Sequence, residues 1–438
     1  MSEPRDRWRS RTRFILAAVG CAVGLGNIWR FPYIAYTSGG GAFMIPYLVA
    51  LVTAGVPLLL LEFAVGQRFQ RAAPGALRAV HPRAEWIGWW AAGVSLVIVV
   101  YYAVIMAWAW DYLVFSTRLG WGADPGAFFR ERFLRISAGP GEMGSLNLAV
   151  LAGLAVTWLA MYWILARGLQ RVGAVVLWTV PLPLVLLAVL VVRGITLPGA
   201  AEGLAYYLTP DFHALLDPKV WLAAYGQVFF SVGIGWGIMI AYASYRPPDT
   251  DVGNNAFITA LVDGGVSYFA GFAVFSTVGY LALQQGVAVP DAVASGFGLA
   301  FVAYPAAISA MPFGAPVFGV IFFLMLLTLG IDSAFAMVEA VIAALRDRFK
   351  LSKQRAAAYA CAAGFLLGLP FTFAGGYHWM DIVDHWASVW GLAMVALLQC
   401  VAVGWFFPIE TLRSYINEVS DFRVGRWWSL SIRWVTPG

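Results

Sequence analysis

The sequence contains few charged residues, few cysteines and few histidines, and each shortage excludes a class of protein. Only 12% of its 438 residues are charged, whereas 61% are hydrophobic. Soluble domains carry roughly 25% charged residues. The three cysteines are odd in number and lie in apolar stretches, so they indicate no disulfide framework. The four histidines are scattered, which argues against a transition-metal site. The composition therefore predicts a bundle of membrane-spanning helices.

Apolar segments long enough to cross a bilayer recur along the whole chain. A span needs about 20 residues, and ten such segments begin near positions 14, 41, 86, 147, 172, 220, 256, 315, 356 and 386. The start of an eleventh helix is expected at about 424–438. The segment from Pro290 to Pro316 is too interrupted for a span and predicts a short hairpin. We expect one integral membrane domain over residues 1–438.

Basic residues divide unequally between the two sides that ten alternating spans define. The clusters at 5–13, 68–83, 167–171, 246, 346–355 and 413–426 share one side and hold 20 of the 28 basic residues. Short loops rich in Lys and Arg stay in the cytoplasm. The distribution predicts a cytoplasmic N-terminus, and we expect the membrane to be a bacterial inner membrane.

The first and sixth spans each contain three closely spaced glycines. Glycine costs roughly 1 kcal/mol against alanine within a helix, and unwound backbone inside a membrane is tolerated only where it lines a cavity. Two breaks five spans apart predict two repeats, at about 10–195 and about 218–408, with a transport site between them. Close helix packing is the alternative explanation, but the matched pair favours the breaks. The glycines are Gly20, Gly24 and Gly26, and Gly233, Gly235 and Gly237.

Six ionisable residues lie within or at the ends of apolar spans. An ionisable group at the bilayer centre costs at least about 2.5–3.5 kcal/mol, so each needs a partner or a role. For Glu62 and Glu339, a structural and a functional role both stay open. Asp111 is expected at a solvated outer helix end. These six residues are Arg30, Glu62, Asp111, Asp263, Asp332 and Glu339.

Two of these carboxylates have hydroxyl residues expected near them. Asp263 is expected near Ser231 in the broken sixth span, and Asp332 precedes Ser333. Carboxylate, hydroxyl and freed carbonyl oxygens are hard ligands that suit an alkali cation. The half-helix that begins near Leu25 presents free N–H groups, which suit a carboxylate. A zwitterionic amino acid flanked by sodium ions satisfies both.

One long run near the N-terminus carries a specific signature. It reads Ala22-Val-Gly-Leu-Gly-Asn27-Ile-Trp-Arg30-Phe-Pro-Tyr33, and it is followed by matching runs at 227–231, 242–245 and 332–333. Together these runs resemble the neurotransmitter:sodium symporter family, and in particular its bacterial transporters of leucine and other hydrophobic amino acids. The resemblance implies an all-α polytopic protein with an inverted five-helix repeat, spans 1–5 and 6–10, in which spans 1 and 6 are broken. It also implies a symporter, not an enzyme, that imports a neutral α-amino acid with sodium by alternating access.

The resemblance implies a role for each matching residue. The substrate pocket would comprise Cys21, Ala22, Gly24, Leu25, Gly26, Ile98, Tyr102, Phe230, Ser231, Gly233, Trp236, Ser333 and Met337. One sodium site would comprise Ala22, Asn27, Ser231 and Asp263, and a second Gly20, Val23, Leu329, Asp332 and Ser333. Arg30 and Asp384 would form an outer gate, and Arg5, Asp347, Trp8 and Tyr245 an inner gate.

The sequence departs from the family pattern at a position that bears on chloride. Chloride-dependent members use residues that match Tyr47, Gln227, Ser231 and Ser267, all of which this chain carries. Many members have asparagine where this chain has Asp263. A fixed negative charge there would do part of the work of chloride, because two anions near one sodium ion repel each other. We therefore expect two sodium ions and no requirement for chloride.

Two further departures bear on the substrate. Gly24 stands where monoamine transporters carry an aspartate, which favours a substrate with its own carboxylate. Trp236 replaces a smaller residue, while Gly233 leaves space beside it. The tryptophan either limits the pocket to glycine or alanine or swings aside for a larger apolar side chain. A betaine or an ω-amino acid is the alternative substrate, and a channel or non-transporting sensor the alternative function. No nucleic-acid partner is expected, and the sequence leaves the oligomeric state open.

Gly173 and Pro183 in the fifth span also match a family pattern. Proline removes one backbone hydrogen bond and clashes with the preceding turn, and glycine lowers the cost of unwinding the residues between them. The segment either opens to admit water from the cytoplasm or forms a static kink.

Overall fold

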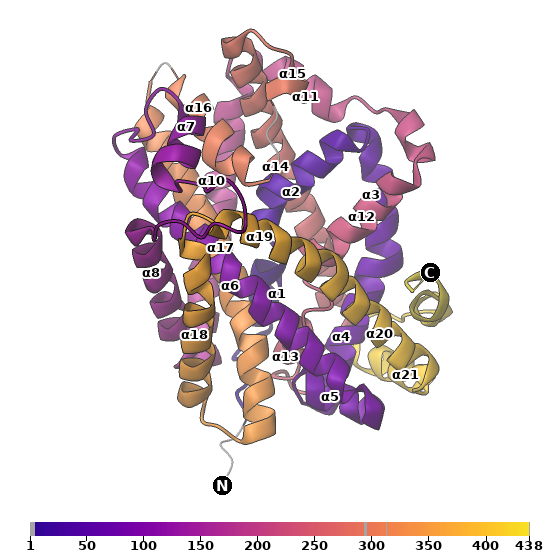
Figure 1. Cartoon of the computed structure of the whole chain (residues 1–438). Coiled ribbons are helices and arrows are strands. Elements are labelled where there is room, and N and C mark those ends of the chain that lie inside the picture. Colours follow the sequence, from indigo (N-terminus) through magenta and orange to yellow (C-terminus); the bar gives the residue numbers. More distant parts are fainter. Residues whose placement is uncertain (1–4, 293–295, 312, 438) are drawn as a thin grey trace.

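The computed structural model describes residues 5–292, 296–311 and 313–437, and most of these residues are helical. Within these ranges there is no β-strand, only two isolated bridges, Gly40 to Pro210 and Leu146 to Phe373. Seven helices here have the length and hydropathy to cross a membrane, or eight if the bent pair α1 and α2 counts as one span. This confirms the expected all-α polytopic fold, whose bundle is shown in Figure 1.

The first five expected spans correspond to helical segments in order along the chain. The second, third and fourth are continuous or nearly so, whereas the first and fifth are each divided into two helices. The elements are α1 (Arg11–Ala22) and α2 (Leu25–Thr37); α3 (Met44–Ala50) and α4 (Val56–Phe69), joined by the π-helical η2 (Leu51–Gly55); α6 (Glu85–Ser116); α8 (Leu148–Leu165); and α9 (Leu169–Thr179) with α10 (Pro181–Ile195).

The second five expected spans are also helical, but two fall outside the set of long apolar helices. The sixth is divided into helices of 14 and 6 residues, and the ninth has only 16 residues. The elements are α12 (Pro218–Ser231) with α13 (Ile238–Ala243), α14 (Gly253–Gln285), α17 (Ala315–Phe349), α18 (Lys353–Gly368), and α19 (Gly376–Asp384) with η8 (His385–Gly391) and α20 (Leu392–Trp405). The expected start of an eleventh helix is α22 (Arg426–Leu430) with η9 (Ser431–Val435).

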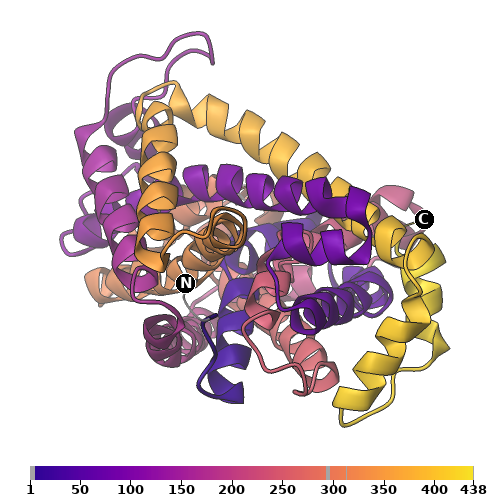
Figure 2. The same cartoon turned by 90° about the horizontal axis from the view of Figure 1, so that it is seen from below.

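Shorter helices cap the two ends of the bundle. The N-terminus, α5 (Ala73–Val80) and α21 (Ile409–Val419) lie at the lower end in Figure 1, here called the N-terminal face. The opposite face carries α7 (Pro125–Ala127), α11 (Ala200–Leu208), α15 (Val289–Ala292) and α16 (Tyr304–Ser309). The last two and η6 (Leu299–Ala303) lie in the segment expected to form a hairpin, of which positions 293–295 and 312 lie outside the described residues. Figure 2, seen from below, shows the C-terminal helices at the edge.

The first span breaks between α1 and α2, whose axes differ by 48°. Val23 and Gly24 between them have extended backbone, and the N–H of Gly24 is held by the side-chain oxygen of Asn27 at 2.8 Å. Gly20 lies within α1, where a Cβ would lie 2.6 Å from the side chain of Val180 and 2.9 Å from that of Asp332. The break is therefore at Val23 and Gly24, whereas Gly20 allows close packing.

The sixth span breaks between Ser231 and Ile238. Gly233, Gly235 and Gly237 have φ angles of +75°, +83° and +72°, a region that residues with a Cβ avoid. Unwinding frees backbone groups inside a membrane, where each unsatisfied group is costly. The carboxylate of Glu62 on α4 is fully buried and accepts the N–H of Gly235 at 2.9 Å. This contact gives Glu62 a structural role, which the sequence had left open.

Candidate functional site

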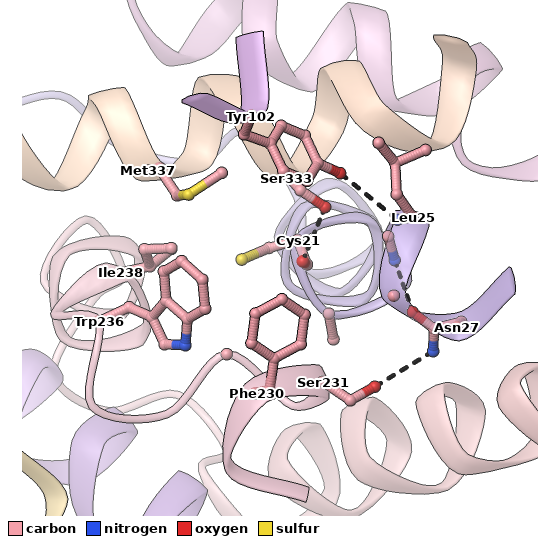
Figure 3. Close-up of a pocket in the computed structure, with 14 residues that line it drawn as sticks. Cys21, Leu25, Asn27, Tyr102, Phe230, Ser231, Trp236, Ile238, Ser333 and Met337 are labelled. Atoms are coloured by element: carbon pink, nitrogen blue, oxygen red, sulfur yellow. Dashed lines mark hydrogen bonds between the residues drawn. The ribbon is translucent and has the colours of Figure 1, made fainter. Parts of the chain in front are cut away.

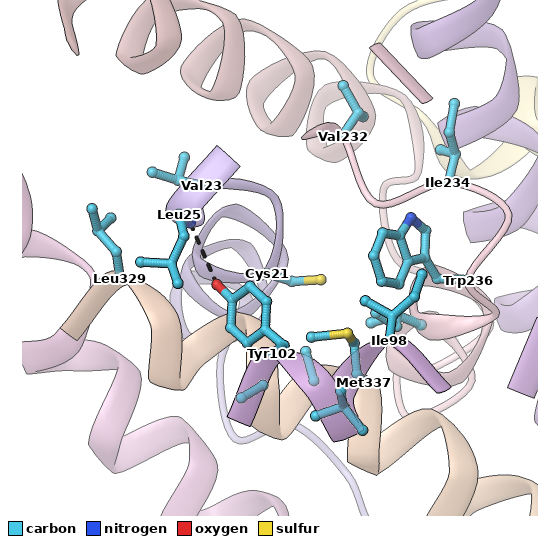
Figure 4. Packing of buried hydrophobic residues seen from close by; sticks show 14 of the residues in the cluster. Cys21, Val23, Leu25, Ile98, Tyr102, Val232, Ile234, Trp236, Leu329 and Met337 are labelled. Atoms are coloured by element: carbon cyan, nitrogen blue, oxygen red, sulfur yellow. Dashed lines mark hydrogen bonds between the residues drawn. The ribbon is translucent and has the colours of Figure 1, made fainter. Parts of the chain in front are cut away.

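The two broken spans meet at a small buried cavity of about 40 Å³, drawn in Figure 3. Its walls come from α1, α2, α6, α12, α13, α17 and the unwound segment of the sixth span. Every residue expected in the substrate pocket lines it except Ile98, and the expected sodium ligand Asn27 lines it too. Figure 4 places the buried Ile98 beside Trp236. Ile238 at the start of α13 lines the cavity instead, and the sequence reasoning missed it. The lining residues are Cys21, Ala22, Gly24, Leu25, Gly26, Asn27, Tyr102, Phe230, Ser231, Gly233, Trp236, Ile238, Ser333 and Met337.

One end of the cavity is formed by the first turn of α2. Leu25 and Gly26 begin this helix, so their N–H groups belong to the set that has no partner within the helix. The N–H of Leu25 lies 3.4 Å from the hydroxyl of Tyr102. The ring of Phe230 covers Gly26, where a Cβ would come within 2.8 Å of the ring. This end therefore presents a positive helix terminus beside a hydroxyl, which suits a carboxylate.

The opposite wall of the cavity is aromatic and apolar. The rings of Phe230 and Trp236 meet edge to face, with 5.7 Å between their centroids. The backbone carbonyl of Trp236 accepts the hydroxyl of Ser95 at 2.7 Å, and this bond fixes the unwound segment against α6. The sulfur of Cys21 faces Gly233, and Met337 closes the wall from α17 (Figure 3). The shape of this wall limits the size of a side chain that the cavity accepts.

Four residues expected or noted near the first sodium site form one buried cluster. Asn27 Nδ2 lies 3.2 Å from Ser231 Oγ, 2.7 Å from Asp263 Oδ1 and 2.7 Å from Ser267 Oγ. The hydroxyl of Ser231 donates to the Asp263 carboxylate at 2.8 Å. Oxygens from α12 and α14 thus converge on one point, which the side-chain nitrogen of Asn27 occupies. A 180° turn of that amide would bring its oxygen to this point and give the hard ligand set that suits an alkali cation, but it would break the hydrogen bond that the oxygen accepts from the N–H of Gly24.

The second carboxylate lies on the other side of α1. Asp332 Oδ1 accepts the hydroxyl of Thr179 at 2.6 Å, and Ser333 Oγ donates to the carbonyl of Cys21 at 3.1 Å and, more weakly, to that of Gly20 at 3.4 Å. Thr179 ends α9 just before the break at Pro181, and the sequence reasoning missed it. The available signal was its hydroxyl within the stretch between Gly173 and Pro183.

The two remaining residues expected at this second site are also nearby. Val23 and Leu329 are both buried. Figure 4 shows them on adjacent ribbons beside the cavity. The second sodium site, with backbone carbonyls from these two positions beside Asp332 and Ser333, stays a prediction.

The cavity is closed toward the face that carries α16 by aromatic packing. The guanidinium carbon of Arg30 lies 4.2 Å from the centroid of the Phe230 ring. Asp384, the expected partner of Arg30, instead accepts the hydroxyl of Tyr101 at 2.6 Å. Arg30 and Asp384 form no ion pair within 4.0 Å in the described structure. The expected outer gate residues are therefore adjacent to the lid but not joined to each other.

The cavity is closed toward the N-terminal face by polar contacts. Arg5 donates to Asp347 at 2.8 Å and to the hydroxyl of Ser244 at 2.6 Å. The indole N–H of Trp8 donates to the carbonyl of Tyr242 at 2.9 Å. All four expected inner gate residues are brought together, since the backbone N–H of Trp8 also donates to the carbonyl of Tyr245 at 3.2 Å.

Behind this gate lies a buried ion pair that the sequence reasoning did not find. Glu339 is fully buried and accepts both the hydroxyl of Tyr245 at 2.7 Å and the ammonium group of Lys353 at 2.5 Å. Lys353 also lies 3.8 Å from Asp6, which accepts from Arg346 at 3.3 Å. Glu339 thus has a charged partner at the start of α18. In the sequence, the only sign of such a pair was the position of Glu339 within an apolar span.

Several other buried polar groups lack a hydrogen-bond partner. The hydroxyl of Tyr47 and both amide atoms of Gln227 are buried without a hydrogen-bond partner. Asp111, expected at a solvated helix end, instead has one buried oxygen without a partner. No group of three or more His, Cys, Asp or Glu side chains that could hold a metal occurs in the described residues.

A many-span helical protein whose two broken spans enclose a cavity has the architecture of a secondary transporter. The chain belongs to the sodium:neurotransmitter symporter family, whose model matches residues 5–125 and 122–438. It is therefore a sodium-dependent transporter in a membrane and not an enzyme. The family assignment confirms the resemblance seen in the sequence.

Relatives with known names cover nearly the whole chain. An uncharacterized sodium-dependent transporter of Methanocaldococcus jannaschii is 42% identical over 437 residues, which are 99% of this chain and 88% of the relative. The sodium- and chloride-dependent creatine transporter 1 of Homo sapiens is 35% identical, over 99% of this chain and 75% of its own. The sodium- and chloride-dependent taurine transporter of Canis lupus familiaris is 34% identical, over 99% and 76%.

Proposed function

We propose that this protein imports a small neutral α-amino acid together with sodium by alternating access. The observation that carries this proposal is the lining of the cavity, where the first turn of α2 meets Ser231, which donates to the buried Asp263, and Ser333, which follows the buried Asp332. The N–H groups of Leu25 and Gly26 face the substrate carboxylate, while Asp263 and Asp332 supply the charge that attracts cations. The N-terminal face is cytoplasmic, as its basic residues favour, and the membrane is a bacterial inner membrane.

Two sodium ions accompany each substrate in this proposal. Asn27, Ser231 and Asp263 with the Ala22 carbonyl hold one ion beside the substrate. Asp332 and Ser333 with the carbonyls of Gly20, Val23 and Leu329 hold the other. Each ion that enters contributes about 2.3 kcal/mol per 100 mV of membrane potential, so two ions concentrate the substrate strongly.

The size of the cavity favours glycine or alanine over a large side chain. The cavity volume of about 40 Å³ is only a few times the volume of one water-sized probe sphere, which is about 10–15 Å³. Trp236 and Phe230 fill the space that a larger substrate side chain would need. The substrates named for the relatives support a second candidate, because creatine and taurine are not α-amino acids. An ω-amino acid or betaine osmolyte is therefore the alternative substrate class.

A survey of ligand-induced stabilisation separates these candidates. The melting temperature of the purified protein is measured with each of the twenty amino acids, taurine, creatine and a betaine, with and without sodium. A ligand at 100 times its dissociation constant adds about 2.7 kcal/mol. We expect glycine or alanine to stabilise the protein only in sodium, and Trp236→Ala to extend the response to leucine. Stabilisation by taurine, creatine or the betaine alone would replace the proposed substrate class.

We also propose that transport needs no chloride, because Asp263 provides a fixed negative charge. Replacement of this carboxylate by the amide in Asp263→Asn should make uptake depend on chloride, since Tyr47 and Gln227 offer unpartnered polar groups for an anion. Uptake is compared in chloride and in gluconate, with Asp384→Asn as a control for loss of a carboxylate elsewhere. Chloride dependence of the unaltered protein would contradict the proposal.

A further inference from the structure

A second pocket lies on the N-terminal face, directly beside the inner gate. It has a volume of about 400 Å³ and is formed by the turn after α4, by α5, by the start of α6 and by the end of α17. Figure 1 shows these four regions at the lower end of the bundle. Five basic and two acidic side chains line it, together with Gln70, Pro74, Gly75, Trp89 and Ala344. The charged residues are Arg5, Arg71, Arg78, Arg348, Lys350, Glu85 and Asp347.

The two carboxylates of this basic pocket already have partners. Asp347 accepts Arg5 at 2.8 Å and the N–H of Ala72 at 2.7 Å. Glu85 accepts Arg78 at 3.3 Å, where both side chains are partly exposed. The pocket therefore keeps an excess of positive charge that no carboxylate in its walls neutralises.

Two arginines in the basic pocket are available to a ligand. Arg71 and Arg348 have neither a hydrogen bond nor an ion pair with any other described residue. The stem of Arg71 lies against Gly75, whose missing Cβ would fall 3.1 Å from it. Arg71 precedes α5 and Arg348 lies in the last turn of α17, so the two side chains approach the pocket from separate elements. Arginine recognises phosphate oxygens through paired N–H groups.

The surroundings of the basic pocket place it at the depth of lipid headgroups. Trp86 and Trp90 on the first turns of α6 are 49% and 41% exposed, and their ring centroids are 5.8 Å apart. Exposed tryptophans gather at the boundary between headgroups and hydrocarbon. Trp89, between them in sequence, lines the pocket itself. The pocket thus lies beside a surface that contacts lipid rather than in a loop far from the membrane.

We propose that the basic pocket binds the phosphate headgroup of an anionic phospholipid from the cytoplasmic leaflet, and that the bound lipid stabilises the closed inner gate. Basic pockets between helices on the cytoplasmic side suit such headgroups. Arg71 and Arg348 contact the phosphate, and Arg78 adds a third positive charge. Because Arg5 and Asp347 form one wall, the headgroup is held against the closed gate. The cytoplasmic location rests on the proposed function, but the binding itself needs neither substrate nor sodium.

Thermal unfolding in detergent tests the binding directly. The purified protein is mixed with micelles containing phosphatidylglycerol or phosphatidylcholine, and Arg71→Ala with Arg348→Ala is compared with Arg355→Ala. Arg355 is an exposed cytoplasmic-side arginine outside the pocket, so this control loses charge on the same face. We expect phosphatidylglycerol to raise the melting temperature by a few degrees in the unaltered protein and in the control. The double variant should lose at least half of that rise.

Two outcomes would overturn the proposal. An equal rise in all three proteins would place lipid binding elsewhere. A rise of the same size with inorganic phosphate alone would make the ligand a soluble anion rather than a lipid. Sodium-driven uptake in vesicles of phosphatidylglycerol and of phosphatidylcholine then tests the gate, because only proteins with the pocket should respond to lipid charge. A protein that shows the lipid-specific rise but no uptake would leave the pocket established and would contradict the transport function alone.

Discussion

The two closures of the cavity differ in their chemistry. Toward the face with α16, an arginine lies over the ring of Phe230 and no ion pair joins Arg30 to Asp384. Toward the N-terminal face, Arg5 pairs with Asp347, and the Glu339–Lys353 pair is buried behind them. A cation over an aromatic ring contributes about 0.5–2 kcal/mol, whereas breaking one side of a buried ion pair costs about 3–5 kcal/mol.

The two sides therefore need different events to open. The outer lid moves when one ring and one guanidinium shift, which breaks few strong contacts. The inner side must separate several charged groups at once, and each of them needs new partners or water. Under the proposed alternating access, opening toward the N-terminal face is therefore the costlier of the two steps, and we expect the occupants of the cavity to supply the difference.

The strongest test of this comparison removes one partner of the buried inner pair. Lys353→Met leaves Glu339 buried without its cation, so we expect a loss of about 3 kcal/mol in stability. Uptake should fall more than tenfold, because the contact of Glu339 with Tyr245 supports the gate. Thermal unfolding and sodium-driven uptake measure the two effects.

A double variant separates charge from packing at this pair. Lys353→Met combined with Glu339→Leu removes both charges, and well-packed apolar replacements of buried pairs are often close to neutral in stability. We expect most of the stability to return while uptake stays low. A single Lys353→Met variant as stable as the unaltered protein would remove the contrast between the two sides.

A smaller effect is expected from the outer side. Arg30→Gln removes the cation over Phe230, so substrate affinity should fall about tenfold or less, in line with about 1 kcal/mol. The melting temperature without substrate should change little. Binding titration with the substrate in sodium measures the first effect, and Arg118→Gln, an arginine in the loop after α6, serves as the control. A large loss of stability in Arg30→Gln would show that the outer closure is as strong as the inner.

The smallest expected effect tests whether the fifth span opens to admit water from the N-terminal face. Gly173→Ala lowers the tendency of α9 to unwind by roughly 1 kcal/mol, which corresponds to severalfold slower turnover. The added Cβ would come within 2.9 Å of Arg13 Cδ, a flexible side chain that can move aside. Sodium release measured by single-turnover efflux should slow, while binding affinity is unchanged. Unaltered release would support a static kink at Pro183.

The sequence predicted the backbone of the site better than its side-chain contacts. Gly233, Gly235 and Gly237 indicated the break because their spacing has a direct conformational meaning. Ile98 was expected in the cavity wall and Ile238 was missed, because which buried side chain lines the cavity depends on packing rather than on a motif.

Long-range partners were the least predictable part of the site. Thr179 meets Asp332 across 153 positions, and Lys353 meets Glu339 only because α18 turns back along α17. The expected pair of Arg30 and Asp384 is not joined, because Arg30 lies over the ring of Phe230 and Asp384 accepts the hydroxyl of Tyr101. Their role as a gate stays a prediction.

The three left-handed glycines of the sixth span also constrain how this transporter can change over evolutionary time. Their backbone excludes a Cβ without strain, so the position of the break in the membrane cannot drift by single substitutions. Cys21, Trp236 and Met337 carry no such restriction, because they only shape the wall around the break. The side chains of the cavity wall can therefore diversify while the backbone frame of the broken span stays in place.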